Sequence, residues 1–195
     1  FAAPPDDTFV VGLPTDTVGL EPAQISSRHT ANIMKHMFGQ LYSVDETGAI
    51  VPNLAESYTI SEDGKEYTFN LREALWSNGD PVTAHDFVYA WNRMLLPSLG
   101  SQYPDMLYDV VNAEQFNKGE ITDFNLVGVK ALDAKTLKVN LKNPAPYFLE
   151  LLAHYTTRPV HKPTIEKFGE IDTLGNQWTR PGNFIGNGPF TLEEW

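Results

Sequence analysis

The segment ESYTISEDGKEYTFNLRE, residues 56–73, constrains the fold of this chain more than any other stretch. Apolar residues alternate with polar ones on both sides of an Asp-Gly pair, at Tyr58, Ile60, Tyr67, Phe69 and Leu71. Such alternation is typical of strands that bury one face, and Asp-Gly is a frequent turn in tight hairpins. The segment therefore predicts an antiparallel hairpin whose apolar face packs against other parts of the chain.

A second hairpin is predicted where FNLVGVKALD and TLKVNLKN flank an Asp-Ala-Lys turn, with Leu137, Val139 and Leu141 on one face. Elsewhere apolar residues recur with the three- and four-residue spacing of helices. This spacing predicts an amphipathic helix that begins near Ser27 or Thr30, and short helices in YFLELLAHY and KPTIEKFGE. Hairpins and scattered helices without a regular strand–helix–strand alternation indicate an α+β fold.

Both ends of the chain also carry strand patterns. TFVVGLPT, residues 8–15, is an apolar run closed by glycine and proline, and it predicts a first buried strand. NGPFTLEEW, residues 187–195, returns to alternation at Phe190 and Leu192 and predicts a last strand.

The composition limits the classes of partner. Of 195 residues 42% are hydrophobic, enough for a buried core, and 25 acids against 14 bases give a net charge of −11. Because nucleic acids and anionic membranes repel such a surface, we expect neither as a partner. The absence of cysteine excludes a disulfide scaffold, a thiolate metal site and a cysteine nucleophile. No apolar run reaches the ~18 residues that span a bilayer, so no membrane insertion is expected.

The stretch LWSNGDPVTAHDFVYAWNR brings an acid, a histidine and a second acid within seven positions: Asp80, His85 and Asp86. These side chains could form part of a hydrolase site if they converged in a cleft. Thr83, however, precedes Asp86 by three residues, which is the spacing of a capping box at the start of a helix. An apolar stripe follows, and Pro97 ends the helical pattern. We therefore predict a helix start here, and keep hydrolysis as the alternative.

No catalytic, metal or cofactor site is predicted elsewhere. His29 and His36 are seven residues apart, as are His154 and His161, whereas metal-binding histidines on a helix are usually four apart. The chain contains no G-x-S-x-G, G-x-x-x-x-G-K-[ST], H-E-x-x-H or G-x-G-x-x-G motif.

The segment LGSQYPDMLYDV places Tyr103, Met106 and Tyr108 in an irregular stretch just beyond the capped helix. Aromatic and thioether groups on a loop suit a binding surface that accepts varied side chains. They suit a small satellite core equally well, so both interpretations stay open.

The stretch NLAESYTISEDGKEYTFNLREALWSNGDPVTAHDFVYAWNR closely resembles the signature region of the extracytoplasmic solute-binding proteins for peptides and nickel, the partners of ABC importers. LKNPAPYFLELLAH, HKPTIEKFGE and GNGPFTLEEW continue the resemblance, which covers essentially the whole chain and is strongest to the oligopeptide-binding members.

The resemblance implies the N-terminal part of a two-lobed periplasmic-binding-protein fold. Residues 1–38 would form the first segment of lobe one, and residues 39–159 the small extra domain peculiar to this family. Residues 160–195 would return into lobe one, and the second lobe would lie in sequence beyond this chain.

The resemblance also implies function. We expect a non-enzymatic protein that captures oligopeptides between its lobes and delivers them to ABC permease subunits, without a cofactor. A nickel complex, a murein peptide or a sugar oligomer is the alternative ligand on the same scaffold. The expected location is the periplasm, after removal of a signal peptide, because FAAPPDDTF at the start has no intact signal sequence but is compatible with a trimmed one. The full-length protein is expected to be a monomer.

Five ligand-binding residues follow from the same resemblance. Ser26, Ser27 and Arg28 occupy the position of the lobe-one strand that pairs with the peptide backbone. Relatives carry an acid, a glycine and a valine there, so backbone pairing is the contact that these positions are expected to keep. Tyr103 and Met106 match the loop of the extra domain that closes over the peptide.

Overall fold

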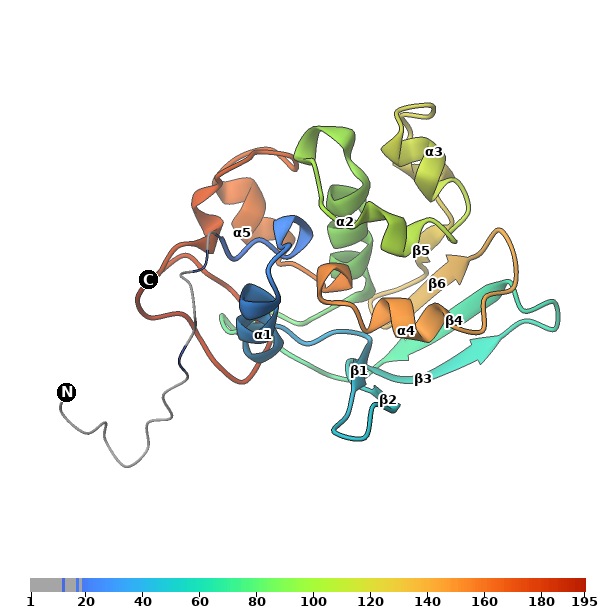
Figure 1. The fold of residues 1–195 in the computed structure, drawn as a ribbon, viewed down its shortest axis with the longest axis horizontal. Coiled ribbons are helices and arrows are strands. Elements are labelled where there is room, and N and C mark those ends of the chain that lie inside the picture. The colour runs from blue at the N-terminus through green and yellow to red at the C-terminus, as the bar shows by residue number, and fades with distance from the viewer. Residues whose placement is uncertain (1–11, 13–16, 18) are drawn as a thin grey trace.

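The computed structural model describes residues 12, 17 and 19–195 of the chain (Figure 1). The strand predicted over residues 8–15 lies, apart from residue 12, outside the described residues.

The two predicted hairpins both form, and they join into one antiparallel sheet. Its strands follow the order β3, β4, β6, β5, with bounds Ala55–Ile60, Glu66–Leu71, Thr136–Asn140 and Val129–Ala131. The two hairpins meet where β4 pairs with β6, in a register that places Phe69 opposite Leu137. Both of these side chains are fully buried, so the apolar faces of β4 and β6 combine into one. The predicted apolar face is wrong for β3, where Tyr58 and Ile60 are 38% and 45% exposed. A small second sheet pairs β1, Tyr42–Val44, with β2, Ile50–Pro52.

Helix α2, Ala84–Leu95, covers this sheet and packs against β5 and β6 (Figure 1). Its apolar stripe is buried, with Phe87, Trp91 and Met94 each 0% exposed. The helix ends just before Pro97, as the sequence predicts.

The other helices are shorter. Helix α1, Arg28–Met37, begins after Ser27, which confirms the predicted start. The two predicted short helices also form, as α4, Phe148–Leu152, and α5, Lys162–Lys167. Helix α3, Ala113–Asn117, was not predicted, because five residues are too few to show a helical period. Single 3-10 turns occupy Pro22–Gln24, Pro97–Leu99, Pro104–Leu107, Phe124–Leu126, Tyr155–Thr157 and Gln177–Thr179.

The prediction of a strand over residues 187–195 is wrong. In the described structure this segment pairs with no strand. Its backbone instead meets the last turn of α1: Gly188 N donates to Met37 O at 2.9 Å, and Phe190 N donates to His36 O at 3.2 Å. Phe190 stays 60% exposed. Alternation alone identifies a segment able to form a strand, and the pairing partner decides whether it does.

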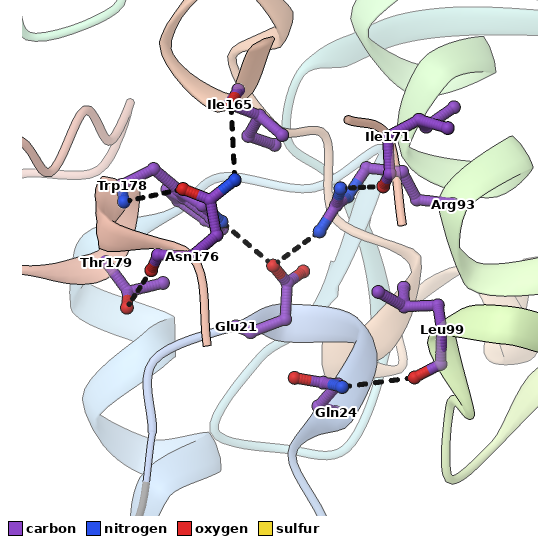
Figure 2. A network of polar contacts seen from close by, with 9 residues as sticks. All are labelled: Glu21, Gln24, Arg93, Leu99, Ile165, Ile171, Asn176, Trp178 and Thr179. Atoms are coloured by element: carbon purple, nitrogen blue, oxygen red, sulfur yellow. Dashed lines mark hydrogen bonds and ion pairs between the residues drawn. The ribbon is translucent and has the colours of Figure 1, made fainter. Parts of the chain in front are cut away.

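A buried polar network connects three distant parts of the chain (Figure 2). Glu21 Oε2 accepts from Arg93 Nη2 at 2.8 Å and from Trp178 Nε1 at 3.0 Å. Arg93 also donates to Ile171 O, and its side chain is 1% exposed. The ion pair thus ties the segment before α1 to α2, and both of them to the segment after α5.

Candidate functional site

A pocket of about 360 Å³ lies at the start of α1, opposite the irregular segment that follows α2. Its walls are made by Ser26, Arg28, Ala31, Asn32, Lys35, Tyr103 and Tyr155. The α1 residues among them are three or four positions apart, so they share one face of the helix.

The chain just before α1 is extended. Ile25 has φ −71° and ψ 128°, and Ser27 has φ −91° and ψ 129°. Ser27 O accepts from Ala31 N at 2.9 Å, the first hydrogen bond of the helix. Ser26 between them is exposed, and among the described residues its backbone N–H and C=O have no hydrogen-bond partner. An extended segment with free backbone groups can pair with another extended chain.

Two rings, Tyr103 and Tyr155, form the opposite wall, and the ring of His154 packs against both of them. The Tyr103 ring lies 5.3 Å from that of His154 and 6.1 Å from that of Tyr155, measured between centroids. The His154 and Tyr155 rings are 4.1 Å apart. Tyr103 and Tyr155 reach the pocket itself. Aromatic faces accept many kinds of apolar and polar group, so this wall suits a ligand of variable structure.

Burial favours the uncharged forms of Tyr155 and His154. Burial raises the pKa of Tyr155 to about 12, and the neighbouring Tyr103 phenol adds to the increase. Burial lowers the pKa of His154, with Asp105 opposing the change and Arg158 adding to it. Both changes in pKa favour the uncharged form, a phenol for Tyr155 and an imidazole for His154.

The α1 side of the pocket is cationic. Arg28 and Lys35 are both exposed, and the pocket lining includes no acid. On a chain with net charge −11, this pocket is a local positive region that attracts a carboxylate.

Only three of the five predicted site residues line the pocket. Ser26, Arg28 and Tyr103 come together around the pocket. Ser27 belongs to the extended segment but does not line the pocket, and Met106 packs half-buried against the core. The satellite-core interpretation thus fits Met106.

Four lining residues were missed by sequence reasoning: Ala31, Asn32, Lys35 and Tyr155. The helical period from Arg28 could have identified the three on α1. Tyr155 is 52 residues from Tyr103, and no local pattern connects them.

The alternative hydrolase site does not form. Asp86 Oδ2 accepts from Thr83 N at 2.8 Å in a capping box, and from Trp76 Nε1 at 3.4 Å. Asp80 Oδ2 lies 3.0 Å from His161 Nε2 instead, and His85 is exposed. Asp86 thus belongs to the helix start, which confirms the capping prediction, while Asp80 pairs with His161 and His85 takes part in neither contact.

Thr83→Ala is expected to lower the free energy of unfolding by about 1 kcal/mol, because the variant loses the threonine half of the capping box. His85→Ala is the matched control, since this exposed neighbour makes no part of the cap, and it should leave stability unchanged. Urea unfolding of the two variants measures the difference. Equal midpoints for Thr83→Ala and the unchanged chain would show that the cap does not stabilise α2.

Among the described residues, no three histidine, aspartate or glutamate side chains gather in a way that could hold a metal ion. No helix in this part of the chain is both long and apolar enough to cross a bilayer.

Comparison with known proteins identifies the family. The sequence model of "Bacterial extracellular solute-binding proteins, family 5 Middle" matches residues 49–195. The chain belongs to this family. The family 5 chain is 41% identical over 193 residues to the periplasmic oligopeptide-binding protein OppA of Escherichia coli, covering 96% of the chain and 34% of that protein.

Solved structures of family 5 proteins have the same fold. The OppA of Burkholderia pseudomallei superposes with a TM-score of 0.86 at 38% identity, covering 94% of this chain and 35% of that one. The OppA of Haemophilus influenzae, solved as a complex with RPPGFSPFR, superposes with a TM-score of 0.80 at 35% identity, covering 87% and 32%. This family 5 chain therefore spans about a third of the length of these relatives. It is an α+β fragment of their two-lobed fold, as the resemblance implied.

Proposed function

We propose that the complete protein containing this chain is a solute-binding protein that captures oligopeptides and delivers them to ABC permease subunits. The observation that carries the proposal is the extended segment at Ser26, whose backbone groups have no partner among the described residues and border a pocket with an aromatic wall. Relatives named for oligopeptide binding, one of them solved with a nine-residue peptide, support the same ligand class.

In the proposed mechanism, an extended peptide adds alongside Ser26 as a strand adds to a sheet edge. Backbone hydrogen bonds are the same for every sequence, so they give affinity without selecting side chains. Tyr103 and Tyr155 would then cover the peptide with neutral aromatic surface. Arg28 and Lys35 would favour a peptide carboxylate at their end of the pocket.

The domain division belongs to the same proposal. We assign residues 1–38 and 160–195 to lobe one and residues 39–159 to the extra domain. In support, Figure 1 shows α1, α5 and the C-terminal segment together at one side, with the four-stranded sheet at the other. The second lobe would close over the peptide and complete the cleft, with the ligand favouring the closed state.

The remaining features follow from the proposed transport role. The protein would act in the periplasm after removal of a leader, as a monomer without enzymatic activity, cofactor, membrane insertion or nucleic-acid partner. A nickel complex, a murein peptide and a sugar oligomer are the competing ligands, and no feature of the pocket favours them.

Ser26→Pro is expected to weaken peptide binding at least tenfold, because proline removes the backbone N–H at the centre of the free segment. Ser26→Ala is the matched control: it removes the hydroxyl, keeps the backbone, and should bind as the unchanged protein does. Calorimetric titration of tri- to pentapeptides into the complete protein measures both.

Equal affinities for the proline variant and the unchanged protein would contradict backbone pairing at Ser26. Saturable binding of a nickel complex or a sugar oligomer, with none of any peptide, would overturn the proposed ligand class.

A further inference from the structure

A second cavity, of about 440 Å³, lies at the other end of α1, where the helix meets the β1–β2 hairpin and residues 187–189. Three of its lining residues are cationic: Lys35, Arg72 and Arg158. The lining includes no acid, although the chain has 25 acids and 14 bases. The volume falls within the range of small-molecule sites.

Arg158 is the most unusual of the three, because it is 2% exposed and has no acidic partner among the described residues. Its Nη1 donates to Met34 O at 2.5 Å and also to Phe38 O. Burial lowers the pKa of Arg158 to about 10, so the guanidinium is still charged at neutral pH. Its buried Nε has no hydrogen-bond partner in the described part of the chain.

A second donor on the same wall is also unused. Asn187 Oδ1 accepts from Gly39 N at 2.9 Å, which fixes the orientation of the carboxamide. Its Nδ2 is buried and has no partner. Gln40 Oε1 lacks a partner too, and that carboxamide can rotate to present its NH₂ group instead. Buried donors without acceptors are rare, and each one costs free energy until an acceptor arrives.

Stabilisation of α1 explains only part of this arrangement. Arg158 satisfies carbonyls at the C-terminal end of the helix, where a cation also interacts favourably with the helix dipole. That role uses Nη1 alone. It does not account for the unused Nε, for the unused Asn187 Nδ2, or for two further cations around the same cavity.

We propose that this cavity binds a small oxyanion, a carboxylate or a phosphate, at a site separate from the peptide pocket. The guanidinium of Arg158 presents several N–H donors in one plane, which matches the oxygen atoms of such groups. Arg72 supplies a second positive charge from the rim, and Asn187 Nδ2 a neutral donor. Lys35 lines both cavities, so an anion here would draw that ammonium away from the peptide pocket.

The test titrates citrate and inorganic phosphate separately into the complete protein, by calorimetry in low-salt buffer without chloride. We expect saturable binding of at least one of them, and the stronger of the two identifies the class of anion. Arg72→Gln should weaken that binding about tenfold, because one charged contact is lost. Lys130→Gln is the matched control: it removes an equal charge from an exposed lysine on β5 and should leave anion binding unchanged.

Peptide titrations of the same variants separate this site from the proposed function. Arg72→Gln should bind peptides as the unchanged protein does, since Arg72 does not line the peptide pocket. The proposal fails if neither anion binds saturably, or if Arg72→Gln and Lys130→Gln weaken binding equally. It also fails if a bound peptide excludes the anion completely, because the two sites would then be one.

Discussion

Arg93→Met is expected to lower the free energy of unfolding by about 3–5 kcal/mol, because it leaves the Glu21 carboxylate buried without its cation. Glu21 is 9% exposed, and its Oε2 accepts from both Arg93 and Trp178. After the substitution only the Trp178 indole N–H would remain. Since the network connects the segment before α1, helix α2 and the segment after α5, the loss should loosen all three.

Urea unfolding of Arg93→Met against Lys138→Met tests this expectation. Lys138 forms an ion pair with Glu66 at 2.6 Å, but the two side chains are 30% and 39% exposed. Exposed pairs of this kind contribute about 0–1 kcal/mol, so the control should be nearly neutral. A double variant, Glu21→Leu with Arg93→Met, should recover a large part of the lost stability. Similar losses in Arg93→Met and Lys138→Met would contradict a special role for the buried pair.

Trp91→Ala is expected to cost about 3–5 kcal/mol through the cavity it opens in the core. Trp91 is 0% exposed. Its Nε1 donates to Thr157 O at 2.9 Å, in the 3-10 turn Tyr155–Thr157. Because Tyr155 in the same turn lines the proposed peptide pocket, peptide affinity should fall as well as stability.

Two measurements separate these effects. Denaturant unfolding gives the loss of stability, and calorimetry under conditions where the variant is folded gives the peptide affinity. Tyr147→Ala removes an aromatic ring that is 49% exposed, so it should cost about 1 kcal/mol or less and leave binding intact. A Trp91→Ala protein that binds peptide with unchanged affinity would show that the turn is held without the indole.

The sequence predicted those elements whose turn, cap and periodicity signals lie close together along the chain. The hairpin around Asp63-Gly64 and the capped start of α2 could be predicted because their signals lie within a few residues of one another. The same holds for the start of α1 after Ser27. In each case the side-chain period and the turn or cap residues favour one structure.

Part of the lining of the candidate pocket could also be predicted from the sequence. The resemblance to a known family led to Ser26, Arg28 and Tyr103, and the structure brings these three around one pocket. Met106, in the 3-10 turn Pro104–Leu107, packs half-buried against the core instead.

The sequence by itself determined the hairpins, the principal helices, an acidic chain without cysteine, and the family. Only the tertiary structure decided that β4 pairs with β6, that Glu21 meets Arg93 across 72 positions, and that residues 187–195 meet α1 rather than a strand. It also decided which cations border which cavity. The physical reason is that side-chain periodicity and capping act over a few residues. Strand pairing, burial of charge and pocket formation depend on which distant segments the packed core brings together.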